Sequence, residues 1–414
     1  MKLHEHTRDF IGRCMTEQEA WTFLSGLCEE VGTRLSGSDE ERRAAEMVMG
    51  GLARCGLQTG TEEFSFTGWR PGTSSVKVRE GQQAREIPSH PLGWSPGSSV
   101  HAPVADMGRG MKEDFQRLDV RGKIAMVCSE NAPDQKDVHR SHKYSYAEEA
   151  GASGFLFYDK RPGGLVAMGS ARLEPRAGTI PAAGICYEDA MSLRRKGEGV
   201  VVEISCTSRN EGLQSRNAVG FRKGELPEEI LVCGHMDSWF SQGAVDNGSG
   251  IAMVVELARL TRRYPLRRSV RFVGFGSEEL GLLGSKAYLR AHPDLSRVVC
   301  VLNLDCSAAR DGVLTVTTND TPSLHAFMEE IGKALHLELE VPEGMSRYSD
   351  HFPFREKGVP GAAFLCRSTT SGFGHTDYDS LDKVGPESFT LPLVVAGAAL
   401  IECAMQDVRF SVSA

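Results

Sequence analysis

The chain has 414 residues, enough for two domains of ordinary size. Its 40% hydrophobic and 25% charged residues are typical of a globular protein with a sizeable core. The formal net charge of −8 argues against a face that binds phosphates, so we expect no nucleic acid partner.

The sequence contains no segment typical of export or membrane anchoring. Residues 1–9 lack the apolar stretch of a signal peptide, and no run reaches the roughly 18 consecutive apolar residues that span a bilayer. The 11 cysteines lie singly and form no CxxC pair, which is typical of reduced thiols. We therefore predict a cytoplasmic protein with no membrane partner, and we expect a homodimer.

The first part of the chain predicts helices followed by a strand. Two helices are expected within residues 16–57, the second running through residues 39–49. Ser36 or Ser38 is the expected cap of that second helix. Residues 61–66 then alternate as a strand does.

The pattern changes near Phe66 and stays changed to about Arg209. Pro, Gly and Ser interrupt this stretch, and its predicted elements are short. They are strands at residues 122–128 and 154–158 and a helix at 144–150. One polar group in the stretch is interpreted as exposed loop rather than as a metal site: Asp134, Asp137, His139 and His142.

From residue 215 onward, strands and helices alternate again. The predicted strands are 229–233, 269–275, 298–304 and 362–366, and a helical pattern covers 251–260. Such alternation predicts a largely parallel sheet with helices on both faces, a three-layer α/β/α fold.

Two domains follow from these changes in pattern. We predict a discontinuous α/β domain of residues 1–66 and 210–414, interrupted by a smaller β-rich domain of residues 67–209.

Candidate ligands and catalytic side chains follow every one of these four strands. In open α/β sheets, ligands bind outside the carboxyl ends of the strands. Groups that all follow strand ends are therefore expected to meet at one site. In chain order they are His235, Asp237 and Asp246, then Glu278 and Glu279, then Asp305, then His375.

The residue types in this set indicate a catalytic metal site. Its five candidate ligands are two imidazoles and three carboxylates, without a thiolate: His235, Asp246, Glu279, Asp305 and His375. Imidazole favours zinc, copper, iron or nickel over magnesium or calcium, and structural zinc sites usually contain cysteine. Five ligands are too many for one open tetrahedral zinc and suit two metals that share a carboxylate.

The same residues lie in strings that resemble the M28 family of co-catalytic zinc aminopeptidases. The resemblance covers residues 215–384 and the segment 32–38 with the helix after it. The strings are His-x-Asp at 235–237, Gly-Ala-x-Asp-x-Gly-x-Gly at 243–250, Glu-Glu-x-Gly-Leu-x-Gly-Ser at 278–285, Asn-x-Asp at 303–305 and Gly-His-Thr-x-x-Asp at 374–379.

The resemblance implies two zinc ions per chain. One ion would be held by His235 and Asp305, the other by Glu279 and His375, with Asp246 bridging them. The implied catalytic residues are Glu278 as the general base, Asp237 as the residue that orients His235, and Tyr348 as a hydrogen-bond donor to the tetrahedral intermediate.

Two further similarities concern the domain organisation and the substrate. Residues 118–127 and 147–156 resemble a protease-associated domain. The string His-Met-Asp-Ser-Trp at 235–239 is similar to the carboxypeptidase Q branch, whose members cleave dipeptides. The implied substrate is a peptide or dipeptide with a free amino terminus.

Three other classes share parts of this pattern. In M20-like amidohydrolases and dipeptidases, a lid domain separates the later ligands, but Asp305 and His375 are too close in sequence to hold one between them. Glutaminyl cyclases bind a single zinc with fewer ligands. A catalytically inactive, peptidase-like binding protein would have broken ligands, whereas this chain has all five together with Glu278.

Overall fold

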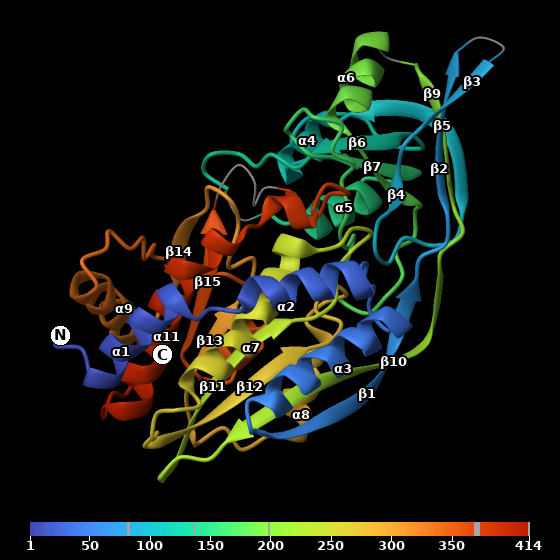
Figure 1. The fold of residues 1–414 in the computed structure, drawn as a ribbon. Coiled ribbons are helices and arrows are strands. Elements are labelled where there is room, and N and C mark those ends of the chain that lie inside the picture. Colours follow the sequence, from blue (N-terminus) through green and yellow to red (C-terminus); the bar gives the residue numbers. More distant parts are fainter. Residues whose placement is uncertain (81–82, 136–137, 198, 368–372, 413–414) are drawn as a thin grey trace.

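The computed structural model describes the whole chain except residues 81–82, 136–137, 198, 368–372 and 413–414. The described residues form two lobes, each organised around its own sheet (Figure 1). The larger lobe contains both ends of the chain, and the smaller lobe lies between them in the sequence.

A mixed sheet forms the centre of the larger lobe, with strand order β1-β10-β12-β11-β13-β15-β14. The four central strands, β12, β11, β13 and β15, run parallel to one another. Antiparallel strands flank them on both sides. The carboxyl ends of the parallel strands therefore lie along one edge. The strands are β1 (Gln58–Arg70), β10 (Arg209–Arg222), β11 (Leu226–His235), β12 (Arg268–Phe275), β13 (Val298–Leu304), β14 (Val313–Thr317) and β15 (Gly361–Arg367).

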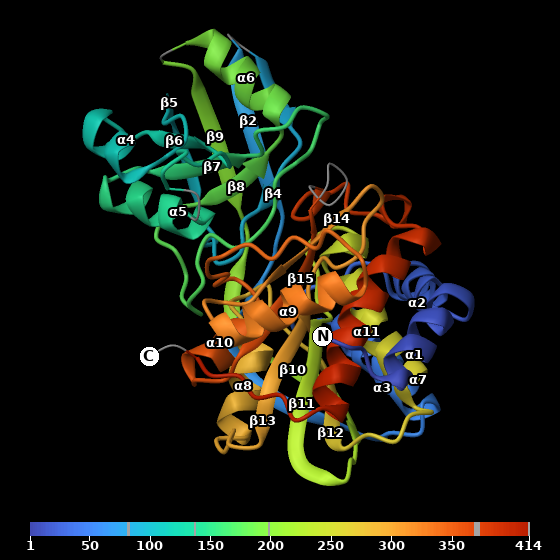
Figure 2. The same cartoon turned by 90° about the vertical axis from the view of Figure 1, so that its left-hand side faces the viewer.

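Helices cover both faces of this sheet, because the side chains of its buried strands alternate between two cores. In β11, Ile230 and Val232 enter one core, while Leu231 and Cys233 enter the other. The three-layer α/β/α fold is therefore confirmed (Figure 2). The first core is covered by α1 (Glu5–Thr16), α2 (Ala20–Gly26), α3 (Asp39–Arg54), α7 (Gly250–Thr261), α9 (Pro322–Ala334) and α11 (Thr390–Met405), and the second by α8 (Leu283–Ala291) and α10 (His351–Glu356).

The two ends of the chain meet in the first core. Helix α1 packs against α11, although only Phe10 and Cys14 are its buried apolar residues. The sequence patterns did not predict α1, whose apolar residues all lie between Phe10 and Met15. The segment 386–405, which contains α11, is apolar and long enough to cross a membrane, but 78% of its apolar window is buried within the fold.

The smaller lobe is an eight-stranded sheet with order β3-β2-β9-β5-β6-β7-β8-β4. Helix α6 packs on one face and α5 on the other. The elements are β2 (Ser74–Glu80), β3 (Gln83–Ile87), β4 (His90–Pro91), β5 (Ser99–Asp106), α4 (Lys112–Arg117), β6 (Ile124–Cys128), α5 (Arg140–Glu149), β7 (Gly154–Tyr158), β8 (Ala182–Ile185), α6 (Tyr187–Lys196) and β9 (Val201–Cys206).

The chain enters and leaves the smaller lobe through two paired strands. β1 and β10 are antiparallel partners from Gln58 and Phe221 to Arg70 and Arg209 (Figure 1). The smaller lobe is therefore joined to the larger one by a continuous two-stranded ladder.

We expect Phe10→Ala to lower the free energy of unfolding by about 3–5 kcal/mol, because Phe10 is fully buried. Its ring fills the space beside Gly397 of α11, where an added Cβ would lie 2.0 Å from a ring carbon. Urea unfolding followed by tryptophan fluorescence measures the change. Met15→Ala is the matched control, because Met15 lies in the same helix and is 69% exposed. Equal destabilisation by the two substitutions would contradict this packing.

Candidate metal centre

The five predicted ligands meet at the carboxyl ends of the parallel strands. Asp246 lies between the two imidazoles and turns one carboxylate oxygen toward each. Its Oδ1 is 3.2 Å from Nε2 of His235, and its Oδ2 is 3.2 Å from Nε2 of His375. The carboxylate of Asp246 therefore belongs to two clusters.

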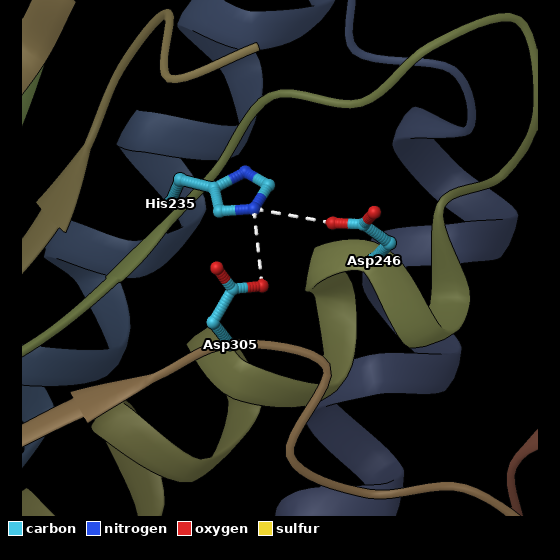
Figure 3. Close-up of side chains that lie close together, drawn as sticks. All are labelled: His235, Asp246 and Asp305. Carbon is cyan, nitrogen blue, oxygen red and sulfur yellow. Dashed lines mark ion pairs between the residues drawn. The ribbon is translucent and has the colours of Figure 1, made fainter. Parts of the chain in front are cut away.

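The first cluster is formed by His235, Asp246 and Asp305 (Figure 3). His235 is the last residue of β11, and Asp305 directly follows β13. Nε2 of His235 also lies 3.6 Å from Oδ1 of Asp305. This ring nitrogen therefore faces two carboxylates that come from different loops.

The second cluster is formed by Asp246, Glu279 and His375. Glu279 follows β12, and His375 lies in the loop after β15 with a φ of 57°. Nε2 of His375 is 3.3 Å from Oε2 of Glu279. In each cluster the three ligand atoms lie within 4.8 Å of one another, a spacing at which one cation can contact all three.

The charges of the two clusters fit divalent cations. Burial raises the pKa of Glu279 to about 7, and repulsion from Asp246 acts in the same direction. Although burial lowers the pKa of His235, the surrounding carboxylates raise it well above its usual value. The shift of His235 arises from the negative charge of the buried carboxylates around it, which cations bound by these atoms would neutralise. Mixed imidazole and carboxylate donors suit zinc.

Asp237 connects the first cluster to the two glutamates. Its carboxylate accepts backbone N–H groups from Glu278 at 2.9 Å and Glu279 at 3.1 Å. Nδ1 of His235 is 3.5 Å from Oδ1 of Asp237 and 3.2 Å from its carbonyl oxygen. Asp237 therefore contacts the ring of His235 and also fixes the backbone that carries both glutamates.

The segment before α3 supports the same loop. Ser38 is the helix cap, because its side chain accepts the backbone N–H of Glu41. Ser36 instead donates to Asp237 at 2.7 Å. The fully buried guanidinium of Arg34 donates to carbonyl oxygens of Met236, Gln242 and Gly243, which fixes the loop between His235 and Asp246.

Glu278 lies beside the ligands without belonging to either cluster. It lines both cavities at the site, one of about 380 Å³ and one of about 220 Å³. Burial raises its pKa well above the usual value for a glutamate, and Glu279 and Asp350 add repulsion. A buried carboxyl group with a raised pKa is suited to proton transfer near neutral pH.

Tyr348 also lines both cavities, and its ring stacks on His139 with 4.7 Å between ring centroids. His139 was predicted to lie in exposed loop, and that prediction is wrong. It caps α5, which lies over the site, and is partly buried there. Asp134 is exposed as predicted, His142 is exposed but lies in α5 rather than in a loop, and Asp137 lies outside the described residues.

Two residues support the ligands in ways that their sequence positions do not predict. Nε1 of Trp239 donates to Oε2 of Glu279 at 2.6 Å. The carboxylate of Asp379 accepts the backbone N–H groups of Val245 at 2.8 Å and Asp246 at 2.9 Å. Asp379 ends the Gly-His-Thr string, so its position was visible, but its role in placing Asp246 depends on a contact distant in sequence.

Both lobes line the larger cavity. The smaller lobe contributes His139, Arg140, Ser170 and Leu173, and the larger lobe contributes Glu278, Glu279, Gly281, Leu282, Lys286, Arg347, Tyr348, Phe352, Glu356 and His375. Three of these side chains are cationic, namely Arg140, Lys286 and Arg347.

Comparison with protein families gives two matches in the chain. Residues 217–391 match peptidase family M28, and residues 98–193 match the PA domain. The first match contains all five candidate ligands, and the second lies within the smaller lobe.

Similar proteins cover most of the chain. Aminopeptidase YwaD of Bacillus subtilis is 29% identical over 94% of this chain and 85% of its own. Carboxypeptidase Q of Mus musculus is 27% identical over 92% of this chain and 84% of its own. Among solved structures, BSAP, a zinc aminopeptidase from Bacillus subtilis, has a TM-score of 0.73 at 25% identity, covering 94% of this chain and 95% of its own. A Shewanella amazonensis M28 peptidase precursor has the same fold, with a TM-score of 0.81 at 23% identity, covering 98% and 97%.

We expect Asp237→Asn to weaken metal binding about 10- to 100-fold, the usual effect of losing a partner that orients a ligand. The amide NH₂ group cannot accept a hydrogen bond, so asparagine keeps only one of the two bonds that hold the backbone N–H groups of Glu278 and Glu279. Competition with a fluorescent zinc chelator measures the affinity. Asp294→Asn is the control, because Asp294 is an exposed acidic residue outside the site. Equal affinity in the two variants would refute this role.

Proposed function

We propose that this chain, which matches peptidase family M28 and the PA domain, is a metallo-exopeptidase that removes amino-terminal residues from peptides with two zinc ions. The observation that carries the two-ion proposal is the position of Asp246, whose two carboxylate oxygens face different imidazoles. We assign one ion to His235 and Asp305, the other to Glu279 and His375, and Asp246 to both.

The proposed reaction divides the work between the ions and Glu278. Zinc ions at such a site lower the pKa of water and polarise the scissile carbonyl group. Glu278 takes the proton of the attacking water and gives a proton to the leaving amine as the C–N bond breaks. Asp237 holds the backbone of Glu278 in place for this transfer. Tyr348, at the wall of both cavities, donates a hydrogen bond to the tetrahedral intermediate.

The cavity supports a short substrate with a free amino terminus. A space of about 380 Å³ is small for an internal segment of a protein but suits one or two residues. The cationic side chains of Arg140, Lys286 and Arg347 lie in its wall, where the carboxylate of a dipeptide would find opposite charge. We therefore propose dipeptides among the substrates. The cytoplasmic location and the homodimer remain predictions from the sequence.

We expect Glu278→Gln to retain both metals and to lower kcat by about 10²–10⁴-fold, because the amide cannot transfer the proton. Metal analysis and turnover of an amino-acyl p-nitroanilide separate the two properties. Asp246→Asn is the contrasting variant, since loss of the shared carboxylate should empty both positions. If Glu278→Gln kept full activity with both metals bound, Glu278 would not be the base.

We expect the unmodified protein to hydrolyse free di- and tripeptides and to leave their N-acetylated forms intact, because the substrate amine is bound at the site. Chromatography of the released amino acids measures the rates. Dipeptide amides test the cationic wall, and their kcat/KM should fall relative to that of dipeptides with a free carboxylate. Cleavage of acetylated peptides would favour an amidohydrolase or an endopeptidase instead.

A further inference from the structure

The two clusters are supported differently. The ligands of the first cluster are held by residues of the larger lobe alone. Asp305 accepts a hydrogen bond from Oγ of Ser349 and donates its own N–H to the carbonyl oxygen of Phe364 at 3.3 Å. His235 is held by Asp237. Among the hydrogen bonds of the described residues, none joins His235 or Asp305 to the smaller lobe.

The ligands of the second cluster receive hydrogen bonds from the smaller lobe. The backbone N–H of Met168 donates to the carbonyl oxygen of His375 at 2.8 Å. Oγ of the buried Ser170 donates to the carbonyl oxygen of Glu279 at 2.6 Å. Nη2 of Arg140 lies 2.9 Å from Nδ1 of His375. Met168 and Arg140 therefore contact His375, and Ser170 contacts Glu279. These two ligands belong to the second cluster alone.

These contacts form part of a small ladder between the lobes. We call residues 166–170 the contact segment. Within it, Ala167 pairs with Thr376 in an antiparallel bridge, and the N–H of Val166 donates to Oδ1 of Asp377 at 3.2 Å. The contact segment therefore runs beside the loop that carries His375, with hydrogen bonds to His375 and Asp377 and a β-bridge to Thr376 between them.

The rest of the smaller lobe holds the contact segment in place. Gly93 accepts from Ala171 at 2.8 Å and donates to Gly169 at 3.0 Å. Gly169 has a φ of 119°, and a Cβ there would lie 1.9 Å from Nη2 of Arg140. Only glycine therefore allows the segment and the guanidinium to approach His375 together.

His375 differs from the other imidazole ligand in its scaffold. His235 ends a central strand, whereas His375 lies in a loop with a left-handed backbone conformation. Hydrogen bonds to the groups behind a ligand fix its orientation and commonly change metal affinity by about 10- to 100-fold. For His375, those bonds come from the other lobe.

We propose that the smaller lobe completes one of the two metal positions. The contact segment positions His375 and Glu279, so the ion bound there depends on the packing of the two lobes. The ion bound by His235 and Asp305 does not. This inference rests on the proposed pair of ions, and it makes Ser170 a positioning residue for one of them.

The test measures zinc affinity in two single-position backgrounds. His235→Ala leaves the position of Asp246, Glu279 and His375, and His375→Ala leaves the position of His235, Asp246 and Asp305. We expect Ser170→Ala to weaken zinc binding about ten-fold in the first background and to leave it unchanged in the second. Neither background needs to be active, because competition with a fluorescent chelator reports binding directly.

A matched variant of the larger lobe should show the opposite pattern. Ser349→Ala removes the hydroxyl that donates to Asp305, so it should weaken binding only in the His375→Ala background. Asp377→Ala repeats the test of the contact segment from an exposed position on the larger lobe, with circular dichroism as the check of folding. If Ser170→Ala does not fold, Asp377→Ala decides the outcome.

The outcomes separate this inference from the proposed function. The proposed function fails if the unmodified protein binds fewer than two zinc ions or cleaves no peptide. The inference fails if that protein binds two ions and is active, but Ser170→Ala and Asp377→Ala weaken both positions equally or neither.

Discussion

The burial of carboxyl groups at one edge of the larger sheet is the constraint on which the site depends. Besides Glu278 and Glu279, the buried acids include Asp350 and Asp379, and burial raises the pKa of each of these two to about 7. Buried charges are costly unless they are paired. Backbone N–H groups, imidazoles and arginines pair some of them, and cations at the proposed metal positions would complete the compensation. Metal binding is therefore coupled to the stability of the folded larger lobe.

The buried acids divide into ligands and supports. Asp246 offers its oxygens to two imidazoles, whereas Asp237 and Asp379 use theirs to accept backbone N–H groups. Asp379 holds the backbone of Asp246, and Asp237 holds that of Glu278. Aspartate thus serves both as a candidate ligand and as a support. Which role it has depends on whether imidazoles or backbone N–H groups surround its carboxylate.

The sequence predicted the parts of the site that depend on local position. Each candidate ligand lies at the end of a strand or in the segment after it, and β13 spans the predicted residues, so strand patterns alone placed Asp305 at this edge of the sheet. The contributions of the smaller lobe were not predictable in this way. Arg140 and Ser170 reach His375 and Glu279 from far away in the sequence, and nothing in their own segments marks the contact. The prediction for His139 was wrong because its burial depends on Tyr348, which is likewise distant in sequence.

The pairing of α1 with α11 has a consequence for how the protein is made. Thr7 in α1 donates a hydrogen bond to Glu402 in α11, which lies 395 residues later in the sequence. During synthesis, α1 therefore leaves the ribosome long before its partner. All eight strands of the smaller lobe lie between Ser74 and Cys206, so that lobe can fold during synthesis. Meanwhile Phe10 and Cys14 lack their packing against α11 until that helix has emerged. The nascent chain therefore presents a folded smaller lobe together with an unpaired apolar surface on α1, which is the kind of surface that chaperones bind.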